Sequence, residues 1–381
     1  MIAPVVLVAP DKFKGSLSAF EVAEAIQSAW LEILPDSLVR LVPIADGGEG
    51  FASTLKHSIH GEWINLPACD ALGRPIPSRY VLSQDQRTAV LEMADCAGLF
   101  RIDSADLRPL LSNTFGTGIQ IRDAIARGAT KVLIGLGGSA TTDGGLGMAT
   151  ALGWSFLDAS GTAVQPIPAQ FHRIHQIVPP SHSLHHVSFV AACDVTNPLL
   201  GPTGSAHVFA PQKGASPSEV TALEAALAHV SRIAREQLGT NFANVPGAGA
   251  AGGIAFGLMT FCNASLVSGF DLVADLLDLH GKMQTADLVI TGEGRLDSQS
   301  LAGKGPGGVA RAAKTQGVPV IGIAGSVEES SAVNELFRAT FPIVDQITTL
   351  PDAMANALPA LQRATRRAAS LYQLGTQFRK T

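Results

Sequence analysis

The chain has 381 residues, of which 46% are hydrophobic and 15% are charged, and its formal net charge is −5 at neutral pH. This length predicts two domains, and the balance of residues is typical of α/β proteins whose parallel strands are buried on both faces. The same balance excludes a largely disordered chain. The negative charge, with no run of lysines or arginines, excludes a nucleic-acid partner.

Four cysteines, at positions 69, 96, 193 and 262, are widely separated and form no C-x-x-C pair. Neither a disulfide framework nor a zinc site is indicated, and a reducing cytoplasm is the expected location. The apolar residues 1–10 lack a basic start and contain Pro4, so they predict a first buried strand and not a signal peptide. No apolar span approaches the ~20 residues of a membrane helix, and we expect no membrane partner.

The first third of the chain begins like a βα unit. After the first strand, a helix is predicted over 19–34, and Ser18 and Glu21 form its capping box. A strand over 38–44 then leads into the acidic glycine loop 45–50 and a further helix from Phe51. From about Trp63 the alternating, proline-rich texture predicts antiparallel strands.

Further along, strands again lead into glycine loops, as at the carboxyl edge of a doubly wound sheet. Residues 166–186 are expected to form an irregular segment at the surface. The remaining predicted strands are 131–134, 187–192, 287–291 and 318–324. The remaining predicted helices are 119–126, 220–238 and 306–313, and a further helix begins with the glycine segment 246–253.

The glycine-rich segment 135–147 is the most informative loop. It follows a strand and precedes a helix, so its backbone N–H groups and the helix dipole favour an anion. Thr141, Thr142 and Asp143 lie in the same turn, which suits a phosphorylated ligand held with a metal ion. The alternative is structural, because glycine-rich turns also permit close packing in parallel sheets.

A dinucleotide site is a competing interpretation, because Gly135, Gly137 and Ala140 partly match its fingerprint and Asp158 follows one βα unit later. That fingerprint requires the helix to begin inside the motif, whereas residues 142–145 prolong the turn. An NAD-linked hydroxyacid oxidoreductase and a non-catalytic receptor for a small anion both remain open. A Walker A loop is absent.

Phosphoryl transfer needs cations, a metal held by carboxylates and an acceptor for the attacking hydroxyl. Acids in loops directly after strands supply candidates, and so do cations near the glycine loops. Singly, each acid also fits a helix cap or an Asx turn, an exposed lysine fits a solvated surface charge, and Arg74 fits the closure of a turn. The acids are Asp46, Asp143, Asp194, Glu293 and Asp297, and the cations are Lys12, Lys14, Arg295 and Lys304.

Seven segments, in order along nearly the whole chain, closely resemble the bacterial type I glycerate kinases. They are residues 9–18, 45–50, 137–145, 193–198, 211–215, 246–253 and 291–297. Many members of that family have Asn where this chain has Thr142 and Ser where it has Lys12.

The resemblance implies phosphorylation of D-glycerate by ATP with Mg²⁺, at the 2-hydroxyl to give 2-phosphoglycerate, with 3-phosphoglycerate as the alternative product. It implies a Rossmann-like, parallel, three-layer α/β domain from residues 1–62 and 285–381, with a second α/β domain, 63–284, inserted. D-glycerate and ATP are the expected partners, and the family permits an oligomer.

Residue roles follow as hypotheses from the chemistry of a small substrate with one carboxylate and two hydroxyls. Asp194 is the expected base, with Asp46 as the second choice. The substrate ligands are Arg295, Lys14, Arg74 and Lys12, and the metal or outer ligands are Asp143 and Asp297. The groups expected to hold ATP are Gly137, Gly138, Ser139, Thr141, Thr142, Gly144, Gly145 and Lys304.

Overall fold

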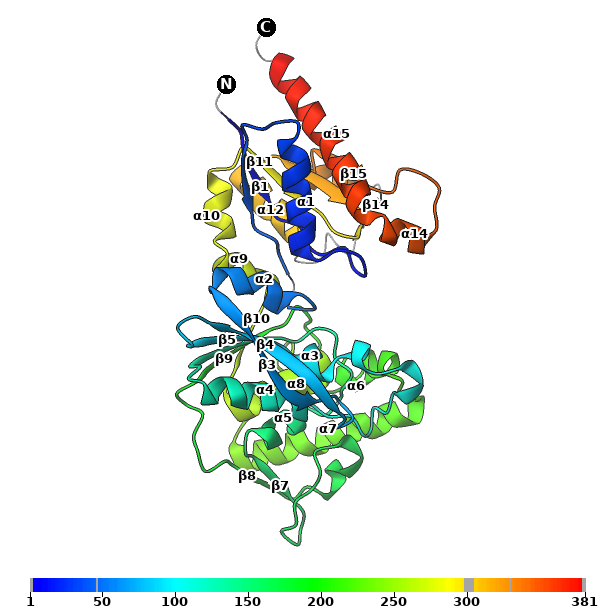
Figure 1. Ribbon diagram of the computed structural model, residues 1–381. Helices are drawn as coiled ribbons and strands as arrows, with labels where there is room; N and C mark the ends of the chain where they lie inside the picture. The colour runs from blue at the N-terminus through cyan, green and yellow to red at the C-terminus, as the bar shows by residue number, and fades with distance from the viewer. Residues whose placement is uncertain (1–2, 46, 298–304, 329, 379–381) are drawn as a thin grey trace. The chain divides into compact units, whose positions relative to one another are not determined.

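The computed structural model describes residues 3–45, 47–297, 305–328 and 330–378 (Figure 1). The chain divides into a terminal unit, Met1–Asp46 with Phe270–Thr381, and a central unit, Gly47–Gly269. These boundaries differ from the expected ones at 62/63 and 284/285. Residues 47–62 belong to the central unit because they carry a helix and a strand of its sheet, and residues 270–284 bury Phe270 and Met283 in the terminal core.

The terminal unit is built on a sheet in which each neighbouring pair of described strands is parallel. Its strands are β1 Val5–Val8, β2 Leu38–Leu41, β11 Leu288–Thr291, β13 Val320–Ala324 and β15 Ala339–Pro342. Their spatial order is β15-β13-β11-β1-β2. The order reverses between β1 and β11, which is where doubly wound folds place their ligands.

Helices cover both faces of this sheet, so the unit has the expected three layers. They are α1 Ala19–Leu31, α9 Gly269–Leu276, α10 Leu279–Gln284, α12 Pro306–Gln316, α13 Ser331–Leu336, α14 Leu350–Ala355 and α15 Ala357–Phe378. Val6 and Val8 face a core shared with α1 and α15, which lie side by side in Figure 1, whereas Leu7 and Ala9 face α9, α10 and α12. This alternation follows from the period of two in a strand.

The capping box predicted at the start of α1 is confirmed. The side chain of Ser18 accepts from the backbone N–H of Glu21, and the Glu21 carboxylate accepts from the backbone N–H of Ser18 at 2.8 Å. These bonds satisfy donors that the first turn of a helix leaves unpaired. The helix ends three residues earlier than predicted, at Leu31.

The central unit contains a mixed sheet of order β10-β9-β6-β5-β4-β3. Its strands are β3 Gly61–Cys69, β4 Pro75–Ser83, β5 Thr88–Glu92, β6 Lys131–Gly135, β9 Ser188–Ala192 and β10 Ser265–Val267. The pairs β3–β4 and β4–β5 are antiparallel, as the sequence predicts, and β5, β6, β9 and β10 are parallel. A small antiparallel pair, β7 Ser155–Leu157 with β8 Gln176–Val178, lies outside this sheet.

The helices of the central unit are α2 Phe51–Ser58, α3 Met93–Ala97, α4 Phe115–Ala126, α5 Leu146–Ala151, α6 Ser205–Phe209, α7 Pro217–Leu238 and α8 Ala250–Cys262. A large core joins one face of the sheet to α4, α5, α7 and α8, and α2 contacts β3, β4 and β5. Residues 166–186 are more ordered than expected, because they carry β8 and bury Phe171. Within the described residues, no helix is both long and apolar enough to span a membrane.

Candidate active site

The carboxyl ends of the parallel strands in the central unit meet at one edge. The last paired residues run straight across the sheet, because Glu92 pairs with Gly135, Gly135 with Ala192, and Ala192 with Val267. The segments that follow these residues are therefore neighbours, although they are far apart in the sequence. They include the start of the glycine loop, Asp194 and Ser268, and we call this edge the central edge.

Close contact between backbones shapes the entrance of the glycine loop. The N–H of Gly137 donates to the carbonyl of Gly47 at 3.2 Å. A Cβ at Gly135 would lie 2.5 Å from the Gly47 carbonyl oxygen, and one at Gly137 would lie 2.5 Å from the Cα of Gly48. Gly47 and Gly48 of the acidic glycine loop thus pack on the glycine loop 135–147. Asp46 itself lies outside the described residues.

Asp194 lies two residues beyond the last paired residue of β9 and is exposed. The hydroxyl of Ser268, just beyond β10, donates to Oδ1 of Asp194 at 3.0 Å. The backbone is held by the bond from the N–H of Cys193 to the carbonyl of Val267, at 2.8 Å. The predicted base therefore has an exposed carboxylate that a neighbouring strand orients.

Glu92, which was not among the predicted site residues, anchors the acidic glycine loop. Its carboxylate accepts from the backbone N–H of Ala52 at 2.8 Å, at the start of α2. Burial raises the pKa of Glu92, although the N–H groups of Ala52 and Gly50 oppose the rise. The sequence pattern did not select Glu92, because it falls inside the alternating segment after Trp63 and not in a loop that follows a strand.

The glycine loop differs from the expected open cradle, because only its first part reaches the surface. Gly138 is exposed and Gly137 is half-buried, whereas residues 139–145 are buried. Within the described residues, the buried hydroxyls of Thr141 and Thr142 have no hydrogen-bond partner. The helix after the loop, α5, begins only at Leu146, so the dinucleotide fingerprint does not apply.

Asp143, expected as a metal or outer ligand, is fully buried and uses both carboxylate oxygens to hold the glycine loop. Its Oδ2 accepts from the backbone N–H and hydroxyl of Thr114, at 2.8 and 2.7 Å, and from the N–H of Gly147 at 3.0 Å. Its Oδ1 accepts from the N–H of Gly145 at 3.2 Å. The side chain has no exposed surface, and burial raises its pKa despite these donors. The carboxylate thus ties the loop to α4 and α5.

The glycine segment 246–253, one of the seven segments of the resemblance, packs on the glycine loop 135–147. A Cβ at Gly252 would lie 1.8 Å from the carbonyl oxygen of Thr141, and one at Gly145 would lie 3.0 Å from the Cα of Gly257. At the start of α8, residues 251–253 all have positive φ, including the non-glycine Ala251 at 52°. Gly144 and Gly145 therefore contact α8, which corrects their assignment to ATP binding.

Lys213 is the most buried cation of the central unit's described residues, and its role was not predicted. It ends a short turn, Pro211–Lys213, and only 1% of it is exposed. Its Nζ donates to Oγ of Ser139 at 2.8 Å and to the carbonyl of Thr141 at 2.5 Å. The local sequence resembles a surface turn, so nothing in it signalled burial.

Arg74 closes the turn between β3 and β4. Its Nε lies 2.6 Å from a carboxylate oxygen of Asp70, which is 2% exposed, and one terminal nitrogen lies 3.1 Å from Asp106. Both carboxylates raise the pKa of the guanidinium. Because its Nε is bonded to the buried Asp70, the structure favours the turn-closing role of Arg74 over substrate binding.

The terminal unit gathers its predicted residues at the reversal point of its own sheet. Arg295 lies in a short strand, β12 Arg295–Leu296, which pairs with β14 Ser326–Val327. Its guanidinium contacts Asp297 at 3.2 Å and Glu328 at 3.1 Å, and its side chain is 66% exposed. The neighbouring Gly294 lies close to Lys14, since a Cβ at Gly294 would be 3.5 Å from the backbone nitrogen of Lys14. Lys14 is exposed.

Lys12 follows β1 and lies 3.8 Å from Asp11, an acid that sequence analysis overlooked. The N–H of Lys12 donates to Oδ1 of Asp11 at 2.6 Å, and Gly305 at the start of α12 lies close to Oδ2 of the same acid. The last predicted residue of this unit, Lys304, lies outside the described residues.

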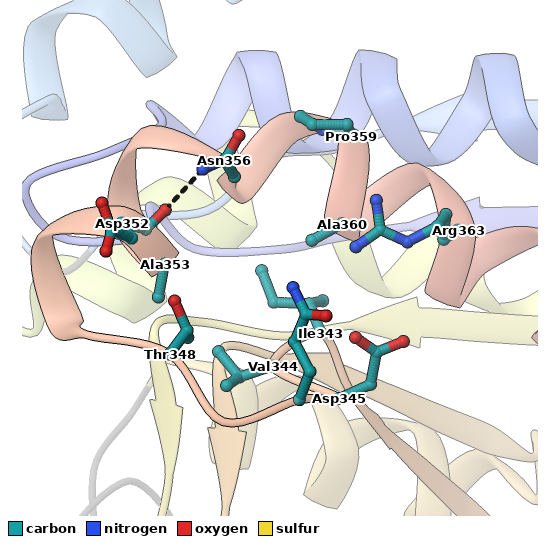
Figure 2. A pocket seen from close by; sticks show the side chains of 11 residues that line it. Ile343, Val344, Asp345, Thr348, Asp352, Ala353, Asn356, Pro359, Ala360 and Arg363 are labelled. Carbon is teal, nitrogen blue, oxygen red and sulfur yellow. Dashed lines mark hydrogen bonds between the residues drawn. The ribbon is translucent and has the colours of Figure 1, made fainter.

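A separate hollow of about 240 Å³ lies in the terminal unit, between the segment 343–348 and helices α14 and α15 (Figure 2). Arg363 and Asp345 border it, and the amide of Asn356 donates to the carbonyl of Asp352 at 2.9 Å. None of the site residues predicted from the sequence is among the described residues that line it.

Comparison with known proteins identifies the family. A model of the glycerate kinase family matches residues 6–373. A glycerate kinase of Bacillus subtilis is 42% identical over 98% of this chain and 99% of its own length, and a glycerate 2-kinase of Escherichia coli is 40% identical over 97% and 98%. The crystal structure of a putative glycerate kinase 2 from Salmonella typhimurium matches with a TM-score of 0.88 and 40% identity, over 98% of this chain and 100% of that one.

The match covers the chain from β1 to α15 and excludes the NAD-linked alternative, in keeping with the late start of α5. The resemblance drawn from the seven sequence segments is confirmed. This chain belongs to the glycerate kinase family, and it is an enzyme that transfers a phosphoryl group to an alcohol.

Proposed function

We propose that the protein transfers the γ-phosphoryl group of ATP to the 2-hydroxyl of D-glycerate, giving 2-phosphoglycerate and ADP. The observation that carries the proposal is the central edge, where the exposed Gly138 and the exposed Asp194 follow two adjacent strands. The name of the Escherichia coli relative, glycerate 2-kinase, supports the 2-position. The four cysteines are free thiols, which supports a reducing, cytoplasmic location.

The central edge supplies two of the groups that phosphoryl transfer needs. Asp194, oriented by Ser268, accepts the proton of the substrate hydroxyl as its oxygen attacks the γ-phosphorus. The new O–P bond forms while the bond to the bridging oxygen of ADP breaks, and the proton stays on the carboxylate. The exposed Gly138 offers its backbone N–H to a phosphate oxygen at the tip of the glycine loop, whereas the hydroxyls of Thr141 and Thr142 are buried behind it.

In the terminal unit, Arg295, Lys14 and Lys12 supply the positive charge expected for a carboxylate or phosphate. A guanidinium suits a carboxylate because it can donate two parallel hydrogen bonds. Mg²⁺ in kinases is held by one or two carboxylates together with phosphate oxygens and water, and it neutralises charge on the phosphates. Of the two acids expected to bind the metal, Asp143 is buried in hydrogen bonds of the glycine loop, so Asp297, 3.2 Å from Arg295, is the proposed Mg²⁺ ligand.

Phosphorus NMR of the purified protein with MgATP and D-glycerate tests the proposal in one spectrum. A phosphate ester at carbon 2 is coupled to one proton and gives a doublet, whereas an ester at carbon 3 is coupled to two and gives a triplet. A doublet supports the proposal. A triplet would keep the kinase but overturn the position, and the absence of any new ester would overturn the substrate.

A further inference from the structure

The glycine loop is held from two sides around its exposed tip. On one side the backbone of residues 97–99 pairs with it, since Leu99 N–H donates to the Gly138 carbonyl at 2.9 Å and Ala140 N–H donates to the Ala97 carbonyl at 2.8 Å. On the other side lies Lys213, whose Nζ bonds to Ser139 and Thr141. The segment between Gly137 and Thr141 therefore has little freedom to move.

A buried ammonium group is costly, and a neutral side chain could have donated to the same two acceptors. The cost is reduced when the charge has an opposite charge in contact, yet Lys213 has no ion pair within 4.0 Å among the described residues. Asp143, the ionisable group that acts on it, directs its oxygens to Thr114, Gly145 and Gly147. The positive charge behind the loop is thus left available to an anion in front of it.

We propose that Lys213 is a positioning residue of the nucleotide site: it fixes residues 139–141 so that the exposed Gly138 presents its N–H group to the phosphates of ATP, and it places a positive charge behind that group. This inference rests on the proposed binding of ATP phosphates by the glycine loop. Electrostatic attraction is strong at such a place because burial lowers the local dielectric constant.

The neighbourhood of Lys213 makes its charge sensitive to pH. Burial lowers the pKa of Lys213 to about 7, while the charge of Asp143 opposes the fall. Leu107 packs against Gly214, and the adjacent Arg108 directs its guanidinium to the carbonyls of Ala105 and Leu107. His207 on α6 is exposed. As the pH rises through about 7, Lys213 loses its proton and the loop should hold phosphate less tightly.

The experiment compares the full-length wild type with Lys213→Met, which keeps the length of the side chain and removes its charge and donors. Calorimetry gives the Kd of MgATP, and steady-state kinetics from pH 6 to 9 give KM for ATP and for glycerate. At pH 6.5 we expect the Kd and KM of ATP to rise about tenfold or more, with KM for glycerate within about twofold, as befits lost ground-state binding. The wild-type KM for ATP should rise through pH 7, and that of Lys213→Met should stay flat.

Lys282→Met is the matched control, because Lys282 also donates to a backbone carbonyl, that of Leu277 at 2.6 Å, but in the terminal unit. It should leave both KM values and the pH profile unchanged. Ser139→Ala keeps the lysine and removes one of its bonds, so KM for ATP should rise by about threefold. The double variant with Lys213→Met should be no worse than Lys213→Met alone, since coupled residues do not act additively.

A folded Lys213→Met with wild-type affinity for ATP and a wild-type pH profile would overturn the inference. If that variant does not fold, a Ser139→Ala variant with unchanged KM for ATP overturns it instead. A wild type that shows no ATP-dependent turnover of glycerate would overturn the proposed function itself, so the two failures are distinguishable.

Discussion

The hydroxyl of Ser268 donates a 3.0 Å hydrogen bond to Oδ1 of Asp194, although 74 residues separate the two in the sequence. The parallel pairing of β9 with β10, which sets Ala192 opposite Val267, brings them together. A hydroxyl that donates to one carboxylate oxygen fixes the orientation of the other. Ser268 thus helps to orient the proposed base.

Replacing Asp194 by Asn should lower kcat about 100-fold or more with little change in KM, because the amide binds similarly but cannot accept the proton. Ser268→Ala should lower kcat by a smaller factor, about three- to tenfold, because the base loses its orientation only. Steady-state kinetics on both variants check this. A near-normal kcat for Asp194→Asn would show that another group is the base.

Asp143→Asn should destabilise the central unit by about 2–3 kcal/mol, because the amide nitrogen would face N–H groups that now have an acceptor. The matched control is Asp158→Asn, because the Asp158 carboxylate also accepts from two N–H groups, those of Ser160 and Thr162, but lies at a surface turn beside Arg173 and should cost less. Urea unfolding measures both. Equal losses would contradict the anchoring role of Asp143.

Glu92→Gln should stabilise the protein increasingly as the pH rises. The pKa of Glu92 is raised in the folded state, so the wild type binds an extra proton there and loses stability as the pH rises from about 4.5 through the folded pKa. Glutamine carries no charge and has no such pH-dependent penalty, and the cost of its amide nitrogen facing backbone N–H groups is the same at every pH. The Tm of the variant relative to wild type should therefore be higher at pH 8 than at pH 4.5 by roughly 2–4 °C, the shift that about 1 kcal/mol produces. A Tm difference that is constant with pH would contradict the assignment.

Arg295→Met should raise KM for glycerate by about tenfold or more, because a bidentate charged contact to the substrate carboxylate is lost. Arg74→Met is the matched control, since both arginines contact two acids, but Arg74 is held at 2.6 Å by the buried Asp70, whereas the side chain of Arg295 is 66% exposed. It should leave KM for glycerate within about twofold. If Arg74→Met raises KM as much as Arg295→Met, the order of these two arginines must be reversed.

Local signals account for most of the fold that could be predicted. The capping box of α1, the buried strands and the antiparallel texture after residue 63 each reflect a few neighbouring residues, and each is present in the structure. The domain boundaries depend on which hydrophobic core a segment such as 47–62 packs against. That choice is made by contacts far apart in the sequence, and local patterns do not record it.

The site was less predictable for the same reason. Glycines at 144 and 145 indicate close approach, but not whether a ligand or another backbone approaches, and here it is α8. Lys213 follows Pro-Gln in a short turn that looks exposed, and the local sequence does not show that its side chain is buried against the distant Ser139 and Thr141. Arg74 shows the converse, because Asp70, four residues earlier, was visible in the sequence as its partner.

The contact of α8 with the glycine loop involves bare main chain on both sides, at Gly145 and Gly257 and at Thr141 and Gly252. Neither surface has a side chain that could be trimmed to make room for a substitution on the other. A change at one position therefore has no compensating change nearby, since even one methyl group at Gly252 collides with an oxygen that cannot be removed. Paired substitutions therefore cannot reshape the contact between α8 and the glycine loop, and its glycines must be kept together.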